Sequence, residues 1–398
     1  MAHQFFASLE AHPDDPILGL IELYKNDPRD TKVNLGVGVF LDEKGRLPLM
    51  KAVGAAEARL VERGAPHGYI PMSGLPGYCQ RLQELVFGVD HEAVLAGRIS
   101  TVQSMGGTGA LHLASVFAHL HLGADKGVVS DPTWGNHITL FEHAGLRTSR
   151  YPYFDPETAN VNFDGMMATL RGLEPKTVVL LHACCHNPTG VDLTPAQWEE
   201  VVNVVREHEL LPLLDIAYQG FGTGLDEDAA VVRRFADAGL NFMVASSCSK
   251  NFGLYGERAG ALHVVTTNAA EARIVTSILK SLVRAEYSNP PTHGAAVVAE
   301  ILSDPALRQS WVDEVTAMRT RILSMRHRLE EEGTKLGADL SFATRQKGMF
   351  SFTGLNAEQM LVLRETYGVY GVKNGRICIA GINEDNVGYV AQALANVR

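Results

Sequence analysis

The alternation of short apolar runs with segments of helical period constrains the fold of this chain more than any other feature. Residues 177–183, 210–214 and 241–246 are mostly apolar, which is typical of strands buried on both faces. A helix is predicted between the first two runs, with Thr194 as its cap, Pro195 in its first turn and Gln197 completing a capping box. This order predicts an α/β fold with a largely parallel sheet.

A second helical pattern lies nearer the C-terminus. Apolar residues recur every three or four positions from Leu307 to Leu329, which predicts a helix from about Pro305 to Glu332 that ends at Gly333. The runs at 349–353 and 376–381 then predict strands of a smaller C-terminal unit. Because 398 residues are too many for one simple core, we expect the long helix to connect two domains.

Polar side chains follow each of the three central strands. Asn187 lies in a Pro-containing turn after the first, Asp215 and Tyr218 follow the second, and Lys250 follows the third with Ser247 and Ser249 beside it. Ligands of open α/β sheets bind beyond the carboxyl ends of the strands, so these groups are expected to converge. An amine, a carboxylate, a phenol and an amide match a pyridine aldehyde: the amine forms a Schiff base, the carboxylate pairs with the ring nitrogen, and the others bind the ring oxygen.

A phosphate site is predicted elsewhere in the chain. The Gly-rich turn at 105–110 leads into an apolar helical pattern, so the free N–H groups of that helix can bind an anion. Arg258 would supply a bidentate cation for the same phosphate.

Each of these signals has a simpler structural explanation. A Gly-rich turn is more often a packing feature, an Asp at a strand end often caps a helix, and a lone lysine is usually solvated. The combination at adjacent strand ends favours function. No metal site is expected from His182 to His186, because alternating strand positions face opposite sides and no second Cys/His pair follows at finger spacing. Trp134 and His137 read either as core residues or as a ring stacked on the cofactor and a histidine supporting Asp215.

Several segments together resemble the fold-type I, class I aminotransferases of the aspartate/aromatic amino acid subgroup. The resemblance covers nearly the whole chain and is carried by NLGVGVF (34–40), GYIPMSGL (68–75), GGTGAL (106–111), DPTWGNH (131–137), HNPTG (186–190), DIAYQGFG (215–222), SSCSKNFGLYGER (246–258), RAEYSNPP (284–291) and RICIAG (376–381). It implies an α/β fold in which a large domain holds a mostly parallel seven-stranded sheet flanked by helices, beside a smaller α/β domain.

The resemblance also implies pyridoxal 5'-phosphate as cofactor. Lys250 would be the Schiff-base lysine and proton shuttle, Asp215 would hold the pyridinium, and the other expected cofactor contacts are Tyr69, Gly107, Thr108, Trp134, His137, Asn187, Tyr218, Ser247, Ser249 and Arg258. Lys250, Asp215, Tyr218 and Tyr69 are the expected catalytic residues.

On the substrate side the resemblance implies two arginines. Arg376 would bind the α-carboxylate, and Arg284, from the other subunit of a homodimer, would face the distal carboxylate of a dicarboxylate. Tyr69 would likewise reach a phosphate in the neighbouring subunit. The remaining expected substrate contacts are Gly38, Leu41, Leu47, Trp134, Asn187 and Phe350.

The implied domain boundaries are an N-terminal arm at 1–14 that contacts the other subunit, a small domain at 15–47 and 333–398, a large cofactor-binding domain at 48–304, and the linking helix at 305–332. The implied reaction is a ping-pong transfer of an amino group between an amino acid and a 2-oxo acid such as 2-oxoglutarate.

Other functions fit the residues less well. A nicotinamide-dependent oxidoreductase would need glycine where His112 stands in the dinucleotide fingerprint, and a non-catalytic relative would lack Lys250. A decarboxylase, lyase or racemase could share the cofactor residues, but the pair Arg284 and Arg376 favours transamination of dicarboxylates.

The amino donor is less clear. Leu41 and Leu47 match relatives that accept aromatic donors, whereas Thr108 and Asn289 match the aspartate-preferring pattern. An enzyme for aromatic and dicarboxylic donors is favoured, with an aspartate aminotransferase restricted to dicarboxylates as the alternative.

Composition sets the remaining limits. The formal net charge of −10 argues against a nucleic-acid partner, and no apolar run reaches the length of a membrane span. Five cysteines make no disulfide framework, and the first residues read neither as a secretory signal nor as a transit peptide, so a cytoplasmic location is expected.

Overall fold

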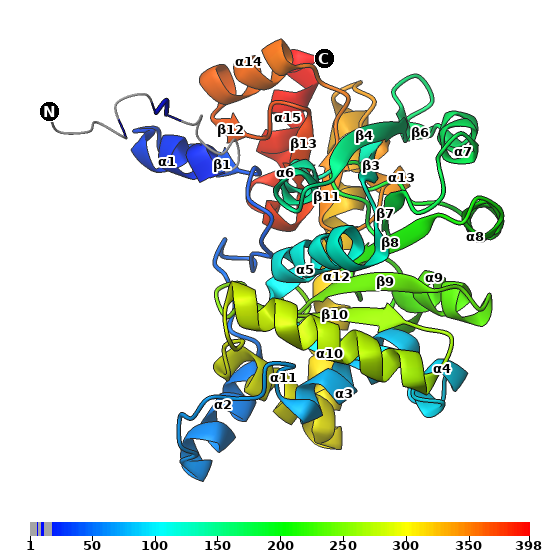
Figure 1. The fold of residues 1–398 in the computed structure, drawn as a ribbon. Coiled ribbons are helices and arrows are strands. Elements are labelled where there is room, and N and C mark those ends of the chain that lie inside the picture. Colours follow the sequence, from blue (N-terminus) through cyan, green and yellow to red (C-terminus); the bar gives the residue numbers. More distant parts are fainter. Residues whose placement is uncertain (1–5, 7–8, 12–17) are drawn as a thin grey trace, which may run out of the picture.

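A seven-stranded sheet forms the centre of the molecule in the computed structural model, which describes all residues except 1–5, 7–8 and 12–17 (Figure 1). The predicted arm at 1–14 therefore lies largely outside the described residues. In sheet order the strands are β2 (Ile99–Met105), β10 (Ala259–Val265), β9 (Phe242–Ser247), β8 (Leu211–Ile216), β7 (Val178–His182), β3 (Lys126–Asp131) and β4 (Arg147–Pro152). Only β10 runs antiparallel to its neighbours, so the predicted α/β fold with a mostly parallel sheet is confirmed.

Helices cover both faces of this sheet (Figure 1). The helices of the chain up to residue 303 are α1 (Leu18–Asn26), α2 (Lys51–Arg63), α3 (Pro76–Phe87), α4 (Glu92–Leu95), α5 (Gly106–Leu122), α6 (Asn136–His143), α7 (Phe163–Arg171), α8 (Pro195–Glu207), α9 (Leu225–Asp237), α10 (Ala269–Glu286) and α11 (His293–Ser303). The capping box predicted for α8 is present, because the Thr194 hydroxyl accepts from the Gln197 N–H and the Gln197 side chain accepts from the Thr194 N–H.

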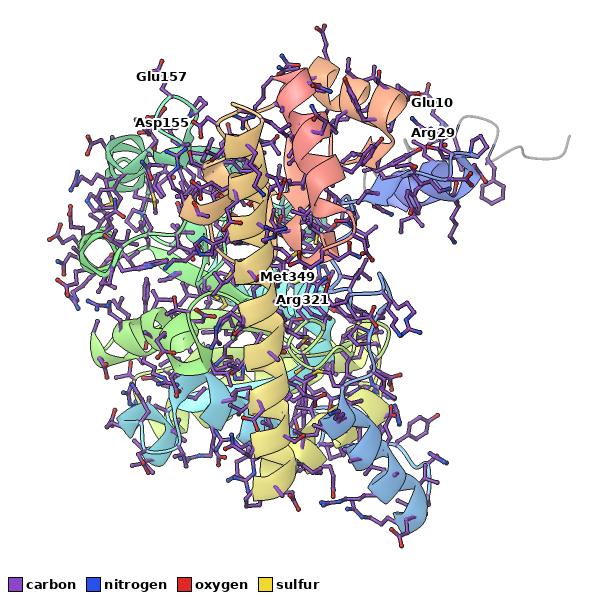
Figure 2. All side chains as sticks on the ribbon, turned by 180° about the vertical axis from the view of Figure 1, so that it is seen from behind. Glu10, Arg29, Asp155, Glu157, Arg321 and Met349 are labelled. Carbon is purple, nitrogen blue, oxygen red and sulfur yellow. The ribbon has the colours of Figure 1, made fainter. Side chains whose placement is uncertain are left out.

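The longest helix, α12 (Pro305–Lys335), runs the height of the molecule, with Arg321 near mid-length (Figure 2). Gly333 does not end it, contrary to the sequence expectation. A Cβ at Gly333 would lie 2.6 Å from Cγ of Leu340, so this glycine lets the following chain pack closely, and the helix continues until Leu336 caps it. The chain then reverses at Gly337, which has a φ of +72°.

Beyond α12 the chain forms small sheets and helices. β11 (Phe350–Phe352) pairs antiparallel with β13 (Arg376–Cys378), and β1 (Val33–Asn34) pairs parallel with β12 (Val369–Tyr370). The run 376–381 is therefore a strand only in its first half, because Ile379–Gly381 form the 3-10 helix η1. The remaining elements are β5 (Phe154–Asp155), β6 (Asn160–Val161), α13 (Phe342–Arg345), α14 (Ala357–Tyr367) and α15 (Val387–Val397).

The pairing of β1 with β12 brings the N-terminal segment to the C-terminal part of the chain, beside α14 and α15 (Figure 1). In the described part of the chain, no helix combines the length and the apolar character that a membrane-spanning segment requires.

Candidate active site

The parallel strands β7, β8 and β9 deliver their last residues to one edge of the sheet. In the register of these strands, His182 lies opposite Asp215, and Asp215 lies opposite Ala245. The turn that holds Asn187 follows β7, and Lys250 follows β9. The polar groups expected to converge from the sequence therefore do so.

A cavity of about 250 Å³ opens at this edge. It is lined by most of the predicted site residues, namely Gly38, Gly107, Thr108, Trp134, Asn187, Asp215, Tyr218, Ser247, Ser249, Lys250, Arg258, Phe350 and Arg376. Leu111 and Ala217 also line it and were not predicted as contacts. Only their positions in the sequence could have identified them as cavity residues, since Leu111 follows the Gly-rich turn and Ala217 lies between Asp215 and Tyr218.

Lys250 is the nucleophile that this cavity offers. Its Nζ atom lies 5.0 Å from the centre of the Tyr218 ring. Burial lowers the pKa of this amine to about 8, with Asp215 opposing the shift and Arg258 and Arg376 reinforcing it. A lysine with such a pKa has a substantial neutral fraction near neutral pH and can attack an aldehyde. Lys250 is thus no ordinary solvated lysine.

Asp215 is held as a charged carboxylate. Its Oδ2 atom lies 3.1 Å from Nε2 of His137, whose Nδ1 lies 2.8 Å from the Thr133 hydroxyl. Burial raises the pKa of Asp215, but the His137 hydrogen bond and the electrostatic effects of His137, His182 and Lys250 outweigh it, so the pKa falls below its usual value. An ionised Asp215 requires Nε2 of His137 to carry the hydrogen, and Thr133 then donates to Nδ1. This arrangement suits pairing with a protonated ring nitrogen.

Behind Asp215 lies a group of histidines that the sequence analysis did not predict to pack together. The centres of the His182 and His186 rings are 4.2 Å apart, and the centre of the His182 ring is 5.1 Å from that of His137. Strand alternation ends with β7 at His182, and Cys185 then adopts a φ of +52°, which turns the chain back. Burial lowers the pKa of His182 to about 3, aided by His137 and opposed by Asp215, so this ring is neutral.

The N-terminus of α5 forms a cradle for an anion. Gly106 has a φ of +67°, and a Cβ there would lie 2.6 Å from Nη2 of Arg258. A Cβ at Gly107 would lie 3.2 Å from that of Ser247. The two glycines therefore let Arg258 and Ser247 approach the free N–H groups of the helix, and the Ser249 hydroxyl is 3.2 Å from that of Ser247. A guanidinium, two hydroxyls and a helix N-terminus fit a phosphate.

Arg376 forms the opposite end of the cavity and is only 4% exposed. Its Nη1 donates to Oδ1 of Asn187 over 3.2 Å, and its Nη2 donates to the Gly36 carbonyl over 2.8 Å. The guanidinium carbon lies 4.3 Å from the centre of the Phe350 ring. A Cβ at Gly38 would lie 2.7 Å from Cζ of Phe350, so Gly38 makes room for that ring.

The Asn187 amide is the link between the two ends. Its Nδ2 lies 3.4 Å from the Tyr218 hydroxyl, while its Oδ1 accepts from Arg376. Burial raises the pKa of Tyr218 well above its usual value, with Arg376 opposing the shift, so the phenol keeps its proton and can donate it in a hydrogen bond. The chemistry of these donors matches a pyridine ring that carries an oxygen and a phosphate.

Besides His137, which lies behind Asp215, four other predicted residues do not line the cavity of the single chain. Tyr69 is 96% exposed, and Arg284 is exposed at the end of α10, where it bonds the Ser288 hydroxyl. Leu47 is 52% exposed and Leu41 is half-buried, with its N–H bonded to the Ala380 carbonyl. One chain alone therefore does not bring these four side chains to the cavity, where their predicted roles require them.

A larger cavity, of about 810 Å³, lies elsewhere, between α3, α9 and α12. Its arginines are mostly engaged with neighbouring acids or carbonyls, as in the contact of Arg81 with Glu84 at 2.7 Å and of Arg233 with Asp226 at 2.7 Å. The volume of a cavity therefore does not identify the active site. The smaller cavity is the candidate, because it contains the amine and the carboxylate whose pKa values are shifted.

Comparisons with known proteins agree with this geometry. The profile of the aminotransferase class I and II family matches residues 30–394. An aspartate aminotransferase of Pseudomonas aeruginosa is 48% identical over 98% of this chain and 99% of its own length. The crystal structure of an aromatic-amino-acid aminotransferase from Burkholderia pseudomallei, covalently bound to pyridoxal phosphate, is 51% identical with a TM-score of 0.97, covering 99% of this chain and all of that one.

A third relative is an aromatic amino acid aminotransferase whose crystals contain aspartic acid. The aromatic amino acid aminotransferase of Psychrobacter sp. B6, crystallised with aspartic acid, is 46% identical with a TM-score of 0.96 over 99% of both chains. The matches span essentially the full length of the chain and of its relatives. The chain therefore belongs to the class I and II aminotransferases, and it is a pyridoxal-phosphate-dependent enzyme of the aspartate and aromatic amino acid type.

Proposed function

We propose that this enzyme accepts both aromatic and dicarboxylic amino acids as amino donors, with aromatic donors favoured, and passes the amino group to a 2-oxo acid such as 2-oxoglutarate. The observation that carries the proposal is the composition of the substrate end of the cavity. Of its two arginines, Arg258 lies at the phosphate end and only Arg376 at the substrate end, beside the ring of Phe350. The part of the substrate end that this chain itself provides suits one carboxylate and one apolar side chain.

The chain's own groups account for the proton transfers. Bound pyridoxal phosphate supplies an electron sink that stabilises the charge left when the substrate Cα loses its proton. Neutral Nζ of Lys250 accepts that proton, and its low pKa makes the transfer reversible near neutral pH. Asp215 keeps the ring nitrogen protonated, Tyr218 and Asn187 bond the ring oxygen, and Arg376 orients the substrate by its α-carboxylate.

The remaining cofactor residues hold the ring in place. In the proposal, Gly107, Thr108, Ser247, Ser249 and Arg258 bind the phosphate and Trp134 covers the ring, with its own ring centre 5.2 Å from that of His137. His137 acts through Asp215.

We propose a homodimer in which each active site is completed by the other subunit. Tyr69 and Arg284 are both exposed, and the segments that carry them are in contact, because Nδ2 of Asn289 donates to the Ile70 carbonyl over 2.7 Å. Their exposure is unusual for residues of catalytic chemistry and is explained if a second copy of the chain covers them.

The proposed domain division follows the chain as expected above, with 48–304 as the large domain and 15–47 and 333–398 as the small one. A cytoplasmic location remains part of the proposal, and it is supported by five cysteines that are all free thiols.

The alternative is an aspartate aminotransferase restricted to dicarboxylates, which Thr108 and Asn289 favour. A panel of amino donors with 2-oxoglutarate separates the two. We expect phenylalanine, tyrosine and aspartate to react with kcat/KM values within about a hundredfold of one another. An aromatic donor about ten-thousandfold slower than aspartate would favour the restricted enzyme instead.

A further inference from the structure

Arg326 is a buried cation of α12 that none of the proposed chemistry uses. It is 1% exposed, and in the described part of the chain its terminal nitrogens bond neutral oxygens rather than a carboxylate. Its Nη1 donates to the Ala343 carbonyl over 2.6 Å and to the Ser351 hydroxyl over 2.8 Å, and its Nη2 donates to the carbonyls of Gly348 and Phe350, both over 2.7 Å. The two terminal nitrogens carry four hydrogens, so each has one acceptor.

A charge in this position is a costly way to build a core. Burial lowers the pKa of Arg326 to about 10, which reflects the cost of removing the guanidinium from water without a paired acid. An apolar side chain of similar length would fill the same space without that cost. The guanidinium of Arg326 instead binds acceptors in three places: the helix α13, the turn at Gly348 and the strand β11. The contacts therefore fix the path of residues 343–351.

That segment contributes Phe350 to the lining of the active-site cavity. Lys347 donates its N–H to the Gly190 carbonyl over 2.7 Å, and a Cβ at Gly190 would lie 2.8 Å from the Phe350 carbonyl, so the segment is pressed onto the turn that carries Asn187. Figure 2 shows Met349 of this segment beside the middle of α12.

Phe350 itself faces the cavity. Its ring centre lies 5.7 Å from that of Tyr218 and 4.3 Å from the guanidinium of Arg376. The strand β11 also pairs with β13, and in this pairing Phe352 of β11 lies opposite Arg376 of β13. Displacement of β11 would therefore move both the ring that packs on Arg376 and the strand partner that supports it.

We propose that Arg326 is a positioning residue for substrate binding: by holding residues 343–351 through four acceptors, it sets Phe350 against Arg376 and so fixes the guanidinium that receives the α-carboxylate. The inference rests on the proposed role of Arg376. Since every amino donor carries an α-carboxylate, Arg326 should affect aromatic and dicarboxylic donors alike, through binding more than through the chemical step.

The test compares three variants of the holoenzyme. Arg326→Met removes the four donors and keeps the length of the side chain, and Arg326→Lys keeps the charge with fewer donors in a different geometry. Leu329→Ala is the matched control, because Leu329 is fully buried one turn further along α12 and its loss lowers stability without touching the hydrogen bonds of Arg326. The readouts are Tm, KM and kcat for phenylalanine and aspartate, and binding of succinate, a dicarboxylate without an amino group, followed by cofactor absorbance.

For Arg326→Met we expect KM for both donors and the Kd for succinate to rise about tenfold or more, with kcat changed less than about threefold. Arg326→Lys should recover part of the loss. Leu329→Ala should lower Tm about as much as Arg326→Met does, while KM stays within about twofold of that of the parent enzyme. If Arg326→Met or, should that variant not fold, Arg326→Lys matches Leu329→Ala in KM and succinate binding, Arg326 serves stability alone and the inference is overturned.

Arg376→Lys, measured in parallel, separates this inference from the proposed function. A normal KM in Arg376→Lys would mean that the α-carboxylate is bound elsewhere, and the role of Arg376 would fail first. A raised KM in Arg376→Lys together with a normal KM in Arg326→Met would overturn the role of Arg326 alone.

Discussion

Lys250 combines two properties that a surface lysine lacks, a fixed position just beyond a strand end and an amine whose pKa is lowered toward the neutral range. Burial makes the ammonium form costly, whereas Asp215 favours it, and the balance leaves a pKa of about 8 in place of the usual 10.5. The amine can therefore act both as a nucleophile toward an aldehyde and as a proton acceptor.

This pKa predicts how the cofactor-free protein captures pyridoxal phosphate. Below pH 8 Lys250 is mostly protonated and cannot attack, so the capture rate should rise with pH and level off above a midpoint of about 8. The rate is followed by the absorbance of the protein-bound cofactor after mixing. A midpoint near the usual lysine value, or a rate independent of pH, would show that the Lys250 amine is not perturbed by its surroundings.

Asp215 depends on the network behind it as much as on its own position. In Asp215→Asn the neutral amide can no longer hold the proton on the ring nitrogen, so we expect kcat to fall on the order of a hundredfold or more. Cofactor should still bind through its phosphate, which absorbance after gel filtration would check. A near-normal kcat in a fully loaded variant would mean that another acid keeps the ring protonated.

The sequence predicted these residues because their functional groups follow successive strands: an amide follows the first, a carboxylate and a phenol follow the second, and an amine follows the third. The sequence did not predict the histidine group behind Asp215. The contact between the rings of His182 and His186 follows the left-handed backbone of Cys185, which no side-chain pattern predicts.

At the scale of elements, helix and strand interiors follow from periodicity, whereas their ends depend on tertiary packing. α8 begins where its capping box predicts, because the cap is local. α12 passes through Gly333 because Leu340 packs against the bare backbone there, and the partner lies outside the helix. Arg326 could not be assigned for the same reason, since its acceptors are mostly backbone carbonyls of a later segment.

The end of α10 carries the residue proposed to read the distal carboxylate. Arg284→Leu should damage reactions of aspartate, glutamate and 2-oxoglutarate by about 2–5 kcal/mol, roughly thirty- to several-thousandfold in kcat/KM, because a bound carboxylate would lose its charged partner. Phenylalanine has no distal carboxylate and should lose much less in its half-reaction. Equal losses for both donors would mean that Arg284 supports folding or the dimer.

The segment between β1 and α2 carries the two leucines proposed to favour aromatic donors. Leu41→Lys combined with Leu47→Thr should lower the ratio of kcat/KM for phenylalanine over aspartate by about ten- to a hundredfold, because burying a ring against polar groups forfeits roughly 1 to 3 kcal/mol. Both residues lie outside the cavity of one chain, so the effect requires that they approach the substrate in the assembled enzyme. An unchanged or higher ratio of kcat/KM for phenylalanine over aspartate would show that Leu41 and Leu47 are only packing residues.

At the scale of the whole molecule, one chain provides the cofactor end and the α-carboxylate end of the site, and it leaves Tyr69 and Arg284 in the open. The resemblance of the sequence to a family suggested a partner for these residues, but nothing in their local pattern distinguishes them from ordinary surface side chains. A shared site explains why two such residues are exposed on segments that the contact of Asn289 with Ile70 joins.

The most direct measurement is the activity of a mixed dimer. One subunit carries Lys250→Ala and the other carries Arg284→Leu, each with a different tag, so that the mixed species can be purified. If each site takes Arg284 from the other subunit, the site that keeps Lys250 regains a normal Arg284 and the mixed dimer should show about half of the parental activity with aspartate. If both residues act within one subunit, or if the chain works alone, the mixed sample should show only the mean of the two impaired parents, and the shared active site would be contradicted.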